Sequence, residues 1–173
     1  ELDGLPIGRR SPRDVAKLGI SRSFQIPQLF IELTAAENLT VAVNSATGEA
    51  LSPTQPAGAG DRRDKALALL DRFGLVHHAE RPIAELAGGV RKLVDIAMAL
   101  ARRPKLLLLD EPTSGVSAEE KFATMDRVIH AVSGDAATIV FVEHDMDIVS
   151  KYADRVVAFY NGRILADGEP AHV

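Results

Sequence analysis

The sequence predicts an α/β fold built around a parallel sheet, and three observations lead to it. Residues 106–109 and 138–142 are short, largely apolar runs, as expected of buried strands. Segments with helical periodicity alternate with such runs, which favours parallel strands joined by helices. Near the end of the chain, Asn161 and Gly162 separate residues 156–160 from residues 163–167, a strong signal for an antiparallel hairpin.

Local cap chemistry predicts where the helices begin and end. Ser11 and the proline after it open a short helix that Gly19 ends, and residues 20–24 then alternate like a strand. Capping boxes at residues 34–37 and 117–120 open two more helices, expected to end near residues 44 and 132. Further helices are expected from residue 61 to the glycine at 74, over residues 90–102, and over residues 145–152.

The helical middle of the chain predicts a lobe inserted between strands of the sheet. We expect residues 1–33 and 104–173 to form a core lobe, and residues 34–103 to form a helical subdomain. Residues 45–60 are rich in Ser, Thr, Pro, Gly and Ala, so we expect a flexible loop there. The whole chain, 1–173, is then one partial domain.

Composition excludes several classes of protein. The net charge of −4 argues against a nucleic-acid partner, because an acidic surface repels phosphate backbones. The absence of cysteine excludes disulfides and thiolate metal sites, and it fits a reducing compartment. No apolar run approaches the roughly 20 residues of a membrane-spanning helix, and the first residues do not resemble a signal peptide.

Two adjacent carboxylates, Asp110 and Glu111, are the strongest candidates for a site. They follow the apolar run at 106–109, and α/β sheets place ligands at the carboxyl ends of strands. Asp110 is suited to hold Mg²⁺, commonly through water, and Glu111 to polarise the water that attacks a γ-phosphate. The alternative is that Asp-Glu-Pro is only a polar loop after a core strand.

Three weaker elements accompany the carboxylates. Ala87, Gly88 and Gly89 form a turn before a helix, where backbone N–H groups can bind an anion, although an ordinary loop would look the same. His144 follows an apolar strand and can bond a phosphate oxygen, but a lone histidine is often structural. Gln25 ends its strand with an amide that can coordinate a metal ion, and by itself it indicates little.

In their order along the chain, these elements resemble the motifs of the ABC ATPase family. Residues 23–25 (Ser-Phe-Gln) resemble the Q-loop, and residues 86–90 (Leu-Ala-Gly-Gly-Val) the signature motif. Residues 106–111 resemble a full Walker B strand with its adjacent glutamate, and residues 112–117 the D-loop. His144 stands at the switch-histidine position. Segments such as Leu-Gly-Ile-Ser-Arg-Ser-Phe-Gln at 18–25 and Gly-Val-Ser-Ala-Glu-Glu at 115–120 further resemble the ATPases of branched-chain amino-acid importers.

The resemblance implies a P-loop NTPase-like ATPase subunit that binds ATP and Mg²⁺ and couples hydrolysis to import. It implies a second ATPase subunit and a membrane permease as partners, no nucleic acid, and a place at the cytoplasmic face of the cell membrane. A soluble ABC protein acting on ribosomes or DNA, and a non-catalytic fragment, are the alternatives. The implied catalytic residues are Glu111 and His144; the implied nucleotide-binding residues are Gln25, Asp110, Ala87, Gly88, Gly89 and Ser117, of which Gln25 and Asp110 also bind Mg²⁺.

The sequence departs from the family pattern at several positions. It contains no Gly-x-x-x-x-Gly-Lys-Ser/Thr, the Walker A loop that the family carries before the Q-loop, so we expect a truncated product, an excised part of a longer polypeptide, or a gene fragment. The chain alone is then expected to hydrolyse little ATP. Ala87 stands where a serine is usual, Val90 where a glutamine is usual, and Ser117 where an aspartate or asparagine is usual. These changes suit a heterodimer with one weaker ATP site.

Overall fold

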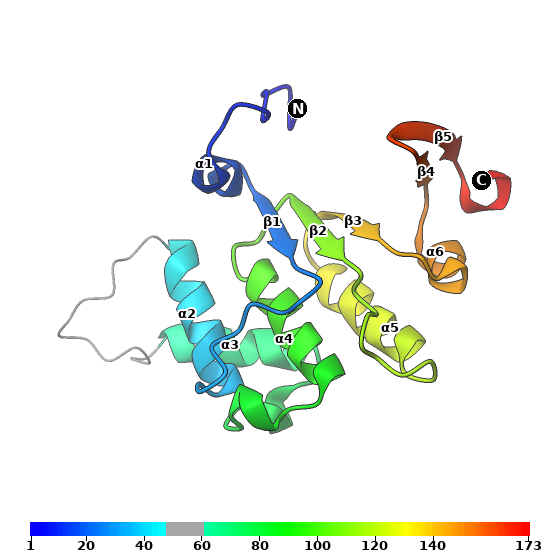
Figure 1. Cartoon of the computed structure of the whole chain (residues 1–173). Coiled ribbons are helices and arrows are strands. Elements are labelled where there is room, and N and C mark those ends of the chain that lie inside the picture. The colour runs from blue at the N-terminus through cyan, green and yellow to red at the C-terminus, as the bar shows by residue number, and fades with distance from the viewer. Residues whose placement is uncertain (48–60) are drawn as a thin grey trace.

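A computed structural model describes residues 1–47 and 61–173, and it contains one parallel and one antiparallel sheet (Figure 1). The parallel sheet has the order β1-β2-β3, formed by Ile20–Ser23, Leu106–Asp110 and Thr138–Val142. Ile20 pairs with Leu106, and Leu106 in turn pairs with Thr138. The carboxyl ends of all three strands therefore meet at one edge of the sheet.

The helices follow the predicted caps closely. The α-helices are α1 (Pro12–Lys17), α2 (Ala35–Thr47), α3 (Asp61–Arg72), α4 (Gly88–Leu100), α5 (Lys121–Val132) and α6 (Met146–Tyr152). Short 3₁₀ helices lie at Val76–His78, Ile83–Glu85 and Pro170–His172. The capping box before α2 is complete, because Thr34 N–H donates to the Glu37 carboxylate and Glu37 N–H donates to the Thr34 hydroxyl.

The predicted boundaries of α2 and α5 differ most from the structure, and the helix predicted over residues 90–102 lies two residues earlier, as α4. Helix α2 extends to Thr47, so residues 45–47 of the predicted flexible loop are helical, and its remainder, residues 48–60, lies outside the described residues. Helix α5 begins at Lys121 rather than at the predicted capping box. There the Ser117 hydroxyl donates to the Glu120 carboxylate at 3.0 Å, and residues 118–120 form a turn that precedes the helix.

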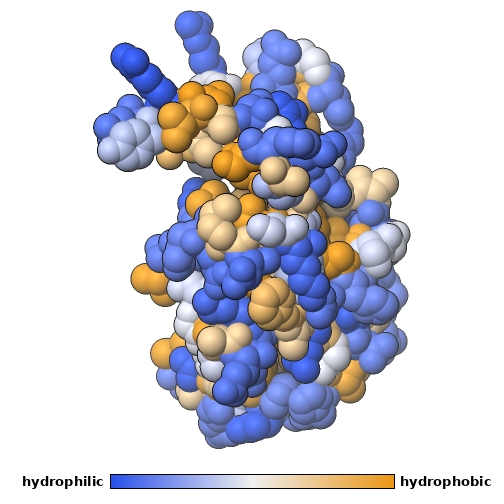
Figure 2. All heavy atoms as spheres, turned by 90° about the vertical axis from the view of Figure 1, so that its right-hand side faces the viewer, coloured by the Kyte–Doolittle hydropathy of each residue, from blue (hydrophilic) through white to orange (hydrophobic). Residues whose placement is uncertain are grey.

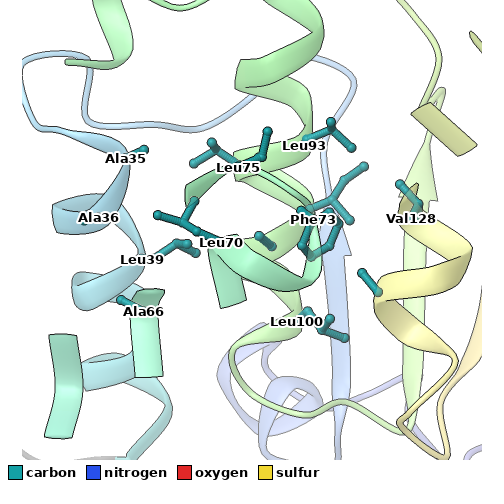
Figure 3. Close-up of a cluster of buried hydrophobic side chains, with 14 of the residues drawn as sticks. Ala35, Ala36, Leu39, Ala66, Leu70, Phe73, Leu75, Leu93, Leu100 and Val128 are labelled. Atoms are coloured by element: carbon teal, nitrogen blue, oxygen red, sulfur yellow. The ribbon is translucent and has the colours of Figure 1, made fainter. Parts of the chain in front are cut away.

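The main hydrophobic core lies between the helices and one face of β2. It joins α2, α3 and α4 to α5 and to Leu107 and Leu109 of β2. Figure 3 shows Leu70 and Phe73 at its centre, between Leu39 of α2 and Val128 of α5. Helix α4 supplies several of the buried side chains and is therefore held firmly against both the other helices and the sheet.

The prediction that residues 138–142 form a strand is right, but the prediction that it is buried is wrong. Val140 and Val142 of β3 are 49% and 62% exposed, and β2 is fully buried only at alternate positions. Apolar composition predicted the strand, whereas burial depends on what packs on each face. Within the described residues, β3 pairs only with β2.

The hairpin at the end of the chain is confirmed. Strands β4 (Val156–Tyr160) and β5 (Arg163–Gly168) pair with each other and stand apart from β3 (Figure 1). Asn161 and Gly162 both have positive φ, +47° and +75°, as a tight hairpin turn requires. From the hairpin's side, Figure 2 shows apolar surface in the upper part of the molecule. Phe159 and Leu165 of the hairpin are 69% and 74% exposed.

No helix among residues 1–47 and 61–173 is both long enough and apolar enough to cross a membrane.

Candidate functional site

Adjacent parallel strands bring Gln25 and Glu111 together, although 86 positions separate them. Ser23 at the end of β1 pairs with Leu109 near the end of β2, so the residues just beyond both strands emerge side by side. The Gln25 side-chain amide donates to Glu111 Oε2 at 2.8 Å. Asp110 is the last residue of β2. The sequence-predicted group of an amide and two carboxylates is thus assembled at the expected edge.

The Asp110 carboxylate is paired with a residue that the motif reading did not single out. Arg22 donates from Nη2 to Asp110 Oδ2 at 2.8 Å, and its guanidinium lies 4.9 Å from the centre of the Phe24 ring. The Arg22 and Asp110 side chains are 52% and 31% exposed, so solvent screens this pair. An arginine three residues before Gln25, on a short strand with otherwise buried neighbours, was the available signal.

Glu111 has a strained backbone that turns the chain at the site. Its φ is +45°, in the left-handed region that non-glycine residues adopt at a cost of about 1–3 kcal/mol. Its N–H donates to the Val142 carbonyl at the end of β3, and its carbonyl accepts from Ser114 N–H. These bonds hold the turn against the ends of β2 and β3, and strain of this kind concentrates at functional sites.

His144 lies between two residues that are tied to the segment after Glu111. Glu143 Oε1 accepts hydrogen bonds from the Thr113 N–H at 3.0 Å and from the Thr113 hydroxyl at 2.6 Å. Asp145 is paired with Lys121 at 2.6 Å. The Lys121 hydrogen bond lowers the pKa of the Asp145 carboxyl below its usual value. The His144 side chain itself is exposed.

A buried lysine and a buried aspartate support the site from α4. Lys92 is 2% exposed, and its ammonium donates to the carbonyls of Phe24, Gln25 and Asp110. Burial lowers the pKa of Lys92, an effect that nearby carboxylates, Asp95 first, partly offset. The motifs in the sequence indicated neither Lys92 nor Asp95, which is 7% exposed. The signal was a charged residue aligned with Ile96 and Leu100 on the apolar face of a helix.

The predicted turn at Ala87, Gly88 and Gly89 forms the start of α4. Ala87 is the N-cap residue, with an extended backbone and no side-chain cap, so its side chain leaves the first N–H groups of the helix free of a cap. A Cβ added to Gly88 would lie 3.5 Å from the Gly115 carbonyl oxygen, and one added to Gly89 would lie 3.5 Å from Val116. The start of α4 therefore lies close to the loop that follows Glu111, at a distance that would bring a Cβ into ordinary van der Waals contact.

The predicted site residues other than His144 fall into two groups. Gln25, Asp110 and Glu111 meet at the ends of β1 and β2. Gly88 and Gly89, which follow Ala87, lie against residues 115–116, which precede Ser117 in the sequence. Helix α4 belongs to both groups, because it begins at Gly88 and carries Lys92.

The oxygen atoms near Gln25 and Asp110 suit a magnesium ion. Magnesium prefers oxygen ligands, and it commonly takes one or two from the protein and the others from water and phosphate. Among residues 1–47 and 61–173, no cluster of three or more His, Asp or Glu side chains is arranged to enclose a metal ion. A site with few protein ligands is therefore the kind that these residues fit.

Comparisons with known proteins agree on one family. The family model described as "ABC transporter" matches residues 2–114. The high-affinity branched-chain amino acid transport ATP-binding protein LivG of Escherichia coli strain K12 is 32% identical over 178 residues, covering 99% of this chain and 68% of that protein. The probable branched-chain amino acid transport ATP-binding protein LivG of Archaeoglobus fulgidus is 31% identical, covering 97% and 66%.

Solved structures give the same result. The ADP conformation of an ATP-binding cassette of an ABC transporter has a TM-score of 0.77 and 30% identity, covering 94% of this chain and 65% of that one. The structure of cbiO1 from Clostridium perfringens, part of the ABC transporter complex cbiONQ, has a TM-score of 0.81 and 29% identity, covering 98% and 65%. The chain thus spans about two thirds of the length of the proteins it matches.

Proposed function

The chain belongs to the ABC transporter family, as its motifs indicated, and on this premise we propose that it serves as the ATP-hydrolysing subunit of an importer. The predicted fold class, an α/β P-loop NTPase-like sheet with helices, is confirmed by the same relatives. The observation that carries the proposal is the Gln25–Glu111 hydrogen bond, because it unites the Q-loop and Walker B motifs at the edge where α/β sheets bind ligands.

We assign roles to the residues at this edge. Glu111 polarises the water that attacks the γ-phosphate of ATP, and the Gln25 amide orients that carboxylate. Asp110 and Gln25 provide oxygen ligands for Mg²⁺, which neutralises phosphate charge when it is bound. His144 donates to the γ-phosphate from the end of β3.

The start of α4 is assigned to the nucleotide held by a second ATPase subunit. The free N–H groups at Gly88 and Gly89 form an anion site that needs no side chain, so Ala87 weakens this site without removing it. Ser117 lies in the loop beside it and faces the same partner. We also propose that residues 1–33 and 104–173 form a core lobe. Residues 34–103 then form a helical subdomain, which contains the start of α4.

The partner on the other side is a membrane permease. Ile26, Phe30 and Ile31 are 73%, 52% and 55% exposed on the segment that joins β1 to α2, and they supply an apolar surface for it. This attachment places the protein at the cytoplasmic face of the membrane. Branched-chain amino acids or related solutes are the proposed cargo, by analogy with LivG, a branched-chain amino acid transport ATP-binding protein.

Glu111→Gln tests the catalytic assignment in a transporter whose ATPase subunit contains this sequence. We expect ATP hydrolysis to fall by about 10²–10⁴-fold, since this is what a general base contributes, while ATP still binds. Glu119→Gln is the control, because it makes the same change on an exposed carboxylate eight residues away and should preserve turnover. Wild-type hydrolysis by the Glu111→Gln protein would contradict the assignment.

Uptake by the reconstituted transporter tests the cargo. Radiolabelled leucine should accumulate in vesicles that contain ATP, and unlabelled isoleucine or valine should compete with it. Uptake of leucine that is independent of ATP, or hydrolysis that responds to none of these amino acids, would contradict this part of the proposal.

A further inference from the structure

Lys92 contacts both strand ends that carry the candidate site. Its ammonium donates to the carbonyl oxygens of Phe24 at 2.8 Å, Gln25 at 3.2 Å and Asp110 at 2.9 Å. An ammonium group has three N–H donors, so these three acceptors satisfy it. Two acceptors follow β1 and the third ends β2.

Asp95 holds the same loop from the next position on that helix face. Its Oδ2 accepts from the Ser23 hydroxyl at 2.6 Å, and its Oδ1 accepts from the Gln28 backbone N–H at 3.1 Å. Residues three apart lie on one face of a helix, so Lys92 and Asp95 act on one surface. Together they bind the loop at its beginning, at its middle and at its end.

Core packing alone does not account for a lysine at this position. Lys92 is 2% exposed, and burying a cation is unfavourable unless it is paired and hydrogen-bonded. Its neighbour Leu93 is equally buried and fills the core without that cost. The lysine is therefore explained by what it binds, which is backbone next to Gln25 and Glu111.

The contacts also specify a particular loop conformation. In a strand, successive residues point to opposite sides, whereas the carbonyls of Phe24 and Gln25 both reach one ammonium. Lys92 therefore favours a turn directly after β1, which ends at Ser23. That turn directs the Gln25 side chain to Glu111.

We infer that Lys92 and Asp95 are positioning residues, which hold the loop at residues 23–28 so that the Gln25 amide meets Glu111. They act from α4, whose first residue is Gly88, and so they join the start of that helix to the Gln25 loop. The inference rests on the proposed function only for the role given to Gln25. We call the hydrogen bonds of Lys92 and Asp95 to this loop the Lys92–Asp95 clamp, and they do not depend on that role.

Amide hydrogen exchange of the 173-residue chain tests the clamp. Lys92→Met keeps the length and apolar stem of the side chain and removes its donors. We expect the amides of Phe24, Gln25, Ile26 and Gln28 to exchange about tenfold faster or more, because the loop then opens without breaking the Lys92 hydrogen bonds. Leu93→Ala is the matched control, since it weakens the same helix without touching the loop, and it should leave these amides unchanged.

A milder variant, Ser23→Ala, still tests the inference if the Lys92→Met chain does not fold. Ser23→Ala removes one hydroxyl that donates to Asp95, and the Gln28 amide should then exchange about threefold faster. An unchanged Gln28 amide in Ser23→Ala, or equal acceleration of the loop in Lys92→Met and Leu93→Ala, would overturn the inference. Either result leaves the role of Glu111 untouched, because that role is measured by ATP hydrolysis.

Discussion

Replacing Thr113 by valine should destabilise the chain, because it removes a side-chain hydrogen bond between the segment after Glu111 and the segment before His144. Thr113 follows Glu111 by two residues, and Glu143 immediately precedes His144. The Thr113 hydroxyl donates to Glu143 Oε1 at 2.6 Å, and Thr113 is 4% exposed. Valine has nearly the same shape, so Thr113→Val removes this bond with little change in packing.

The magnitude follows from the charge of the acceptor. A hydrogen bond to a charged group contributes about 1.5–3 kcal/mol, and one between neutral groups about 0.5–1.5 kcal/mol. After the change Glu143 Oε1 keeps the Thr113 backbone N–H, and the other oxygen, Oε2, is buried and has no hydrogen-bond partner within the described residues, so no second side chain replaces the lost hydroxyl. We therefore expect the free energy of unfolding to fall by about 2 kcal/mol.

Urea unfolding followed by circular dichroism measures this loss. A fall of about 2 kcal/mol lowers the unfolding midpoint by about 1 M for a small domain. Thr40→Val is the matched control, because the Thr40 hydroxyl is equally buried but donates to a neutral carbonyl, that of Ala36. A loss in Thr113→Val no larger than the loss in Thr40→Val would refute the reasoning.

Three further predictions concern pH, the hairpin and association. Burial, the largest cause, lowers the pKa of His78 below its usual 6.5, so the stability that its neutral form provides above pH 6.5 should be lost as the pH falls through the lowered pKa. His78→Leu should reduce this dependence in thermal melts, and an unchanged pH profile would contradict the prediction. Gly162→Ala should lower the free energy of unfolding by about 1 kcal/mol, because the φ of Gly162 is +75°. Gly134→Ala is the control, because Gly134 is similarly open but has no positive φ, and it should not destabilise the chain. Equal losses in urea unfolding would exclude this backbone explanation. Val142 is 62% exposed on β3, which pairs on one side only within the described residues, so Val142→Lys should reduce self-association in light scattering; identical masses across a dilution series would count against it.

Features governed by neighbouring residues could be predicted from the sequence. The helix cap at Ser11, the capping box at Thr34 and Glu37, and the turn at Asn161 and Gly162 all use side chains or φ angles within a few positions. Such contacts depend mainly on residues that are close in the sequence. The exposure of β3 was predicted wrongly, because an apolar sequence does not specify which of its faces another segment covers.

The candidate site was predicted in part, for a similar reason. The carboxyl ends of adjacent parallel strands lie at one edge of the sheet, and this rule predicts that Gln25 and Glu111 lie close together, as they do. The motifs did not reveal Arg22, Lys92 and Asp95, because all but one of the hydrogen bonds described for these side chains join residues between 67 and 88 positions apart. The roles of all the predicted site residues, His144 and Ser117 among them, stay predictions.

Helix α4 explains why the two groups of site residues cannot behave independently. Its first turn, at Gly88 and Gly89, lies against the loop after Glu111, and Lys92 one turn later binds the backbone beside Gln25. A helix transmits displacement along its axis because each turn is hydrogen-bonded to the next. In the proposed transporter, a nucleotide that a partner subunit brings to the start of α4 can therefore also displace the loop at residues 23–28, which is proposed to face the permease. The buried Lys92 and Asp95 join α4 to the loop at residues 23–28, so in this proposal the nucleotide and the permease act on one structural element.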